Sequence, residues 1–129
     1  MSVSHTIKTT YSRGTGPQIV STSQIAAEGD DYINLDVAAA STNLQIDLAI
    51  VRARLKSIMI TVTSALTLKT NSTSAPDNTF ALLADKPLIW NVDSLTADPF
   101  GADVTTIYVT TPSGPSVNLQ IVTLFDRTP

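Results

Sequence analysis

The chain has 129 residues, 43% hydrophobic and only 15% charged, which fits one domain with one core. A formal net charge of −3 leaves no excess of Lys and Arg to neutralise phosphates, so nucleic acid and anionic membranes are disfavoured as partners. With 0 cysteines, a disulfide framework and a thiolate metal site are excluded. Residues 1–16 have neither a signal-peptide pattern nor an apolar span, which predicts synthesis in the cytosol without processing.

The first residues are predicted to form an arm. Val3, Ile7 and Tyr11 lie on one side of a possible strand, and a Gly-Thr-Gly-Pro break follows at residues 14–17. We therefore expect an arm over residues 1–16 and one β-sandwich domain over residues 17–129. Such an arm could dock by pairing as an added strand with another chain, and its deletion would then leave the fold intact. The alternative is that it is the first strand of the same sandwich.

Alternation of apolar and polar residues then predicts short strands. After a strand near residues 18–26 and a turn at residues 28–31, Ile33, Leu35 and Val37 are expected to face inward. The same period-two pattern recurs over residues 44–50 and again over residues 58–62.

Between these two stretches, the positions that would continue the inward-facing side of the strand carry charged residues. Arg52, Arg54 and Lys56 would break a buried face, so we place a corner near residues 51–55 that joins strands of two different sheets. A helical face through Leu48, Val51, Leu55 and Met59 is the competing interpretation, which the crowded Thr and Ile residues after Ser57 disfavour.

The remaining chain continues in short strands. Strands are expected at residues 66–69, 80–82 and 88–92, with a loop at residues 71–77 and a long loop at residues 93–103. Two last strands are predicted at residues 104–110 and 117–125. The total of about eight to ten strands predicts an all-β antiparallel sandwich of the jelly-roll or Greek-key kind.

Residues for catalysis or metal binding are sparse. His5 is the single histidine, and it lies in the arm with no evident carboxylate to orient it, so a Ser-His-Asp triad is not expected. Asp93, Asp98 and Asp103 do not match the spacing of a calcium loop and are read as solvated carboxylates. We expect no enzyme activity, no cofactor and no metal.

Several side chains are instead candidates for protein contacts. Tyr32 and Tyr108 lie on the polar sides of their strands, where exposed tyrosines often anchor interfaces. Trp90 shares a side with Leu88 and Val92, which favours the core, whereas an exposed Trp90 would favour a carbohydrate-binding or fibre-tip module. The candidate contact residues are Val3, His5, Ile7, Tyr11, Arg13, Tyr32, Arg52, Arg54, Lys56 and Tyr108.

The second half of the chain resembles a known family. The resemblance lies in residues 55–60 (LKSIMI), 66–76 (LTLKTNSTSAP), 86–90 (KPLIW), 103–110 (DVTTIYVT) and 124–129 (LFDRTP). These segments resemble the small decoration, or cement, proteins of tailed-bacteriophage capsids. The resemblance implies a β-sandwich on the outside of an icosahedral head, bound to the major capsid protein and often trimeric. It brings no catalytic residues and does not cover the arm.

Overall fold

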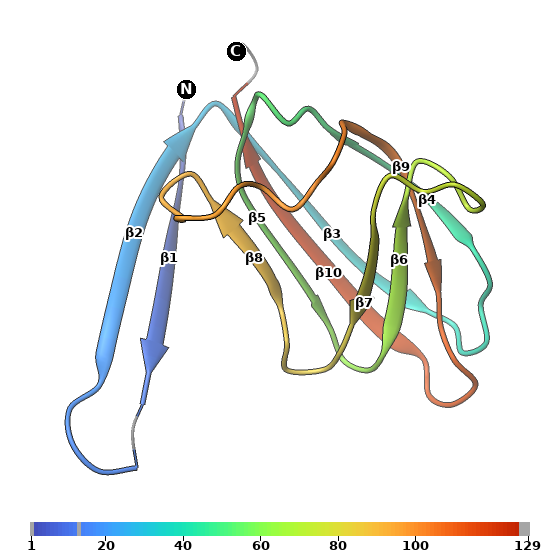
Figure 1. Ribbon diagram of the computed structural model, residues 1–129, viewed down its shortest axis with the longest axis horizontal. Coiled ribbons are helices and arrows are strands. Elements are labelled where there is room, and N and C mark those ends of the chain that lie inside the picture. The colour runs from blue at the N-terminus through green and yellow to red at the C-terminus, as the bar shows by residue number, and fades with distance from the viewer. Residues whose placement is uncertain (1, 13, 127–129) are drawn as a thin grey trace.

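A computed structural model describes residues 2–12 and 14–126, which form ten strands and no helix (Figure 1). The all-β prediction is confirmed. In chain order the strands are β1 (Val3–Tyr11), β2 (Ile19–Ala27), β3 (Gly29–Val37), β4 (Leu44–Ile50), β5 (Leu55–Val62), β6 (Leu66–Thr70), β7 (Thr79–Leu82), β8 (Leu88–Asn91), β9 (Val104–Thr110) and β10 (Val117–Phe125).

Eight of the strands build two antiparallel sheets of four, in the orders β3-β10-β5-β8 and β4-β9-β6-β7. We call them the β3 sheet and the β4 sheet. Counted from β3 onward, the two orders are 1-8-3-6 and 2-7-4-5. This arrangement is that of a jelly roll, in which the chain repeatedly crosses between the sheets.

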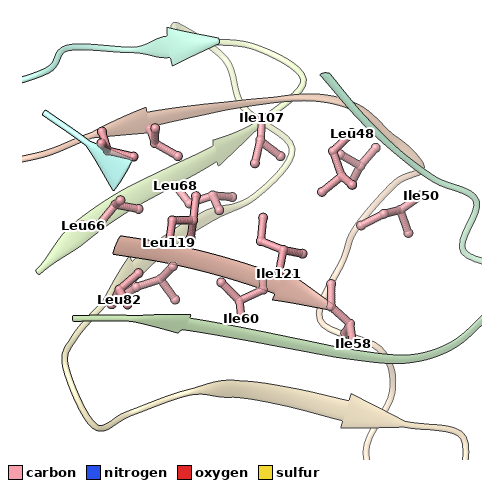
Figure 2. Close-up of a cluster of buried hydrophobic side chains, with 14 of the residues drawn as sticks. Leu48, Ile50, Ile58, Ile60, Leu66, Leu68, Leu82, Ile107, Leu119 and Ile121 are labelled. Carbon is pink, nitrogen blue, oxygen red and sulfur yellow. The ribbon is translucent and has the colours of Figure 1, made fainter. Parts of the chain in front are cut away.

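The core lies between the two sheets and follows from the period-two pattern. Figure 2 shows Ile58, Ile60 and Ile121 of the β3 sheet facing Leu68 and Ile107 of the β4 sheet. All five side chains are at most 2% exposed. Each buried side chain of this size contributes roughly 1.5–3 kcal/mol relative to an exposed one, so this layer accounts for most of the hydrophobic stabilisation.

The predicted corner between β4 and β5 is present. A turn at residues 52–54 carries the chain from the β4 sheet to the β3 sheet, and Val51 O accepts hydrogen bonds from the amides of Arg54 and Leu55. The backbone makes a single turn here because the next residue, Leu55, already faces the core, where its side chain is 4% exposed. A helix of more than one turn does not form here, as the sequence indicated.

The first two strands form a hairpin outside the sandwich. β1 pairs with β2 along its whole length, from Val3 opposite Ala27 to Tyr11 opposite Ile19. The Gly-Thr-Gly-Pro segment is therefore the hairpin connection, where Gly16 adopts a φ of 98° that only glycine tolerates easily. The arm thus extends through β2 to Ala27, because β2 gives its hydrogen bonds to β1 and to neither sheet of the sandwich.

The hairpin is fixed at one end only. Ile25 and Ala27 are buried together with Leu124 of β10, and Val3 and Ile7 pack against this small cluster. From this base the hairpin diverges from the β3 sheet, and its connection points away from the sandwich (Figure 1).

Candidate protein-contact surface

The three basic residues at the corner do not form one basic patch. Arg52 pairs with Asp98 through both ends of its guanidinium, with Nε–Oδ1 at 3.0 Å and Nη2–Oδ2 at 3.2 Å, and its amide donates to Asp103. The hydrogen bond to Asp98 raises the pKa of Arg52 above its ordinary value, so this side chain stays charged. Arg52 thereby holds the long loop at residues 93–103 against the corner.

The other two basic residues lie near the end of β10. Lys56 Nζ is 3.5 Å from Asp126 Oδ2, and the Asp126 amide donates to the carbonyl of Arg54. Arg54 contributes to a pocket of about 400 Å³ that also contains Asp31 and Asp126, and its Nε is buried without a hydrogen-bond partner. Because carboxylates and the guanidinium share this pocket, it presents no single charge to a ligand.

The two candidate tyrosines lie on opposite sides of the molecule. Tyr32 is 60% exposed on the outer side of β3, whereas Tyr108 is half-buried on the outer side of β9, between Gln45 and Lys69. The structure therefore does not bring them together into one site.

Candidates from the arm lie on one side of the hairpin, and Arg13 falls outside the described residues. Val3, His5 and Ile7 are half-buried near the hairpin base, while Tyr11 is 68% exposed near its far end. His5 Nε2 lies 3.1 Å from Asp30 Oδ2 of β3. The structure therefore supplies the carboxylate that the sequence did not reveal, and this pair ties the hairpin base to the sandwich.

Opposite Tyr11 stands Ile19, which is 66% exposed. Tyr11 and Ile19 lie on the same side of the hairpin as Ile25 and Ile7. Near the base, this side packs in the cluster with Leu124. One side of the hairpin is therefore apolar at both ends but covered at only one.

A second uncovered apolar surface crosses the outer side of the β3 sheet. Tyr32 stands opposite Val122, Val122 opposite Met59, and Met59 opposite Ile89. Met59 is 42% and Ile89 45% exposed. We call these four residues, Tyr32, Val122, Met59 and Ile89, the outer stripe.

Met59, Ile89 and Val122 were not candidates from the sequence, although a signal was present. Met59 and Ile89 each lie between two inward-facing apolar residues, as in the Ile58-Met59-Ile60 run, and Val122 follows the buried Ile121 directly. A strand with one solvated side should instead carry a polar residue at that position. Uninterrupted apolar runs in a sandwich therefore indicate positions where the outer side is also apolar.

A groove separates β1 from the outer stripe. Its volume is about 640 Å³, and it is bounded by Ile7 and Thr9 of the hairpin and by Met59, Ile89 and Val122 of the sheet. This volume lies within the range of ordinary binding pockets.

Trp90 is half-buried and packs against the main core, as its parity predicted. Its indole Nε1 donates to the Thr96 carbonyl at 2.9 Å. The ring is therefore not an open platform of the kind on which sugar-binding modules stack a ligand.

The loop carboxylates are engaged with protein groups. Asp98 pairs with Arg52 and accepts from the amide of Phe100, and Asp103 accepts from the amide of Arg52. Among residues 2–12 and 14–126, no three His, Asp or Glu side chains come together in a geometry suited to a metal ion. The same residues include no helix long and apolar enough to cross a membrane.

Comparison with protein-family models, with curated proteins and with solved structures finds no match for this chain.

Proposed function

We propose that the protein is a structural virion protein that decorates the outside of a phage head, where it binds the major capsid protein and stabilises the shell. It would be made in the host cytoplasm and act without catalysis, metal or cofactor. The sequence resemblance to capsid decoration proteins supports this assignment. The jelly roll is compatible with it, since that fold recurs in viral capsid proteins, although a fold alone does not define a function.

The observation that carries the proposal is uncovered apolar surface in two ordered places. The far end of the hairpin exposes Tyr11 and Ile19, and the outer stripe exposes Tyr32, Met59 and Ile89. Exposed apolar patches bounded by polar residues mark protein contact sites in proteins that are otherwise well packed. A protein that works in a regular array of copies needs such surfaces, and weak contacts repeated over a lattice add up through multivalency.

Purified particles of the encoding phage provide the test. We expect mass spectrometry to find the protein in them at a fixed ratio to the major capsid protein. Antibodies against the purified protein should label intact particles, because the proposed position is on the exterior. A tail protein of the same phage serves as the control for label that is not on the head.

Two results would overturn the proposal. One is the absence of the protein from particles that infect normally, and the other is labelling of the tail or of broken heads only. A further check adds the purified protein to heads that lack it, with the fraction that co-sediments as the readout.

A further inference from the structure

The far half of the hairpin presents a formed but uncovered contact surface. Tyr11 and Ile19 are cross-strand partners, and aromatic and β-branched side chains in such pairs pack against each other. Both are about two-thirds exposed, at 68% and 66%. Two-stranded hairpins are marginal in water when nothing packs on them, so this half of β1 and β2 gains stability from any apolar partner.

The charges of the hairpin and of the sandwich are opposite. Of the 8 Lys and Arg residues, Lys8 and Arg13 lie in residues 2–27, whereas all 11 Asp and Glu residues follow this segment. The outer stripe begins on β3, where Asp36 is exposed on the outward side of Tyr32, and Asp30, on the same side, is paired with His5 of its own hairpin. A positive hairpin is thus complementary to the acidic surroundings of the stripe.

We propose that the hairpin end of one copy, through Tyr11 and Ile19, packs on the outer stripe of a second copy. The two surfaces differ and lie on different parts of the chain, so the contact can repeat head-to-tail from copy to copy. The hairpin connection points away from the sandwich in Figure 1, which leaves its end free to reach a neighbour. The groove of about 640 Å³ beside Met59 and Ile89 gives the incoming side chains a recess.

This contact deepens the proposed function by naming one of its partners as the protein itself. A head-to-tail contact either closes into a ring or continues as an open filament.

Sedimentation velocity of the purified full chain tests the contact. We expect the mass to exceed the 13.7 kDa of one chain at concentrations of tens of micromolar and to fall as salt is raised. The end variant, Tyr11→Thr with Ile19→Thr, and the stripe variant, Met59→Thr with Ile89→Thr, should each weaken association at least about tenfold. Val20→Thr is the matched control, because Val20 is 48% exposed on the opposite side of the hairpin and should leave association unchanged.

Mixing the two double variants gives the sharpest result. The end variant keeps an intact stripe and the stripe variant keeps an intact hairpin end, so the mixture has one functional contact. We expect a one-to-one complex with twice the 13.7 kDa mass and nothing larger. Circular dichroism melts of each variant establish that both are folded before mixing.

Three results would overturn the inference. The first is a wild-type monomer at every concentration up to about 0.5 mM, where even a weak contact with a Kd near 0.1 mM is occupied. The second is association that survives in both double variants, and the third is the absence of a complex when the two folded variants are mixed. Failure here is separable from failure of the proposed function. A protein that self-associates but is absent from virions refutes only the function, and a virion protein that stays monomeric refutes only this contact.

Discussion

Asn71 joins two loops that the sequence leaves separate. Its Nδ2 donates to Asp77 and to the carbonyl of Asp103, both at 2.7 Å, and its Oδ1 accepts from the Thr105 amide at 2.8 Å. Its φ of 68° lies in the left-handed region, which asparagine tolerates better than most residues. One side chain therefore fixes the loop at residues 71–77 to the start of β9.

Asn71→Ala should destabilise the protein by about 2 kcal/mol. It removes these hydrogen bonds, and the Cβ of alanine strains the backbone at positive φ. Asn71→Gly removes the same hydrogen bonds without the left-handed strain and should be less destabilising by about 1 kcal/mol. Urea unfolding of the two variants measures both terms. Equal stability of the Ala and Gly variants would show that the backbone conformation carries no cost.

Thr111 is a buried hydroxyl with both of its hydrogen-bonding functions in use. It is 4% exposed, its Oγ1 donates to the Ala38 carbonyl at 2.7 Å, and the same atom accepts from the Ser41 amide at 3.0 Å. These bonds join the connection between β3 and β4 to the end of β9.

Thr111→Val should lower the free energy of unfolding by about 1 kcal/mol, since the change removes both hydrogen bonds and leaves the Ser41 amide without this acceptor, while the Ala38 carbonyl keeps its bond from the Ser41 hydroxyl. Thr106→Val, at a half-buried position of β9, is the matched control and should change it by less than about 0.5 kcal/mol. Denaturant titration followed by tryptophan fluorescence is suitable because Trp90 is the single Trp. Equal effects of the two substitutions would contradict the role of the Thr111 bonds.

At the scale of elements, the hairpin has one anchored and one free half. The basal pairs, such as His5 with Ile25, lie over the cluster formed with Leu124, whereas the far pairs, such as Tyr11 with Ile19, are exposed. Local stability follows the packing of each segment, so the two halves should open with different free energies.

Hydrogen exchange at low micromolar concentration should therefore show slow exchange in residues 23–27 and fast exchange in residues 19–21. Leu124→Ala removes the residue on which the base packs and should speed exchange along the whole hairpin, while β5 and β9 keep their protection. Uniform protection of β2 in the wild type would mean that the far half is covered already.

At the scale of the whole molecule, the sandwich is complete without the hairpin. Both four-stranded sheets are built from strands after Glu28, and they contact the hairpin at its base, through the cluster with Leu124 and the pair of His5 with Asp30. The hairpin is therefore an addition to the jelly roll rather than a part of its core.

A variant that begins at Glu28 should still fold cooperatively into a β-structure, as judged by circular dichroism, but with a lower melting temperature. The loss has a defined cause, because Leu124, which is 0% exposed in the full chain, becomes accessible, a cost of roughly 1.5–3 kcal/mol. Adding Leu124→Thr to this variant replaces the newly accessible apolar side chain with a polar one and should raise its solubility. A variant that begins at Gly16 keeps β2 without its partner strand, so it should be the less stable and more aggregation-prone of the two. Complete unfolding of the variant that begins at Glu28 would show that the hairpin is part of the folding core.

The sequence by itself determined the strand-rich fold, most strand positions and the corner at residues 51–55. Period-two alternation is a local signal. The charged residues Arg52, Arg54 and Lys56 interrupt it at positions that would face inward, which marks where the chain changes sheet. Only the tertiary structure decided that β1 pairs with β2, that Asp30 meets His5 and that Asp98 meets Arg52. It also assembled the outer stripe from four strands that are far apart in the chain. Such contacts depend on which strands become neighbours, and no local pattern encodes that choice, because many pairings satisfy the same alternation.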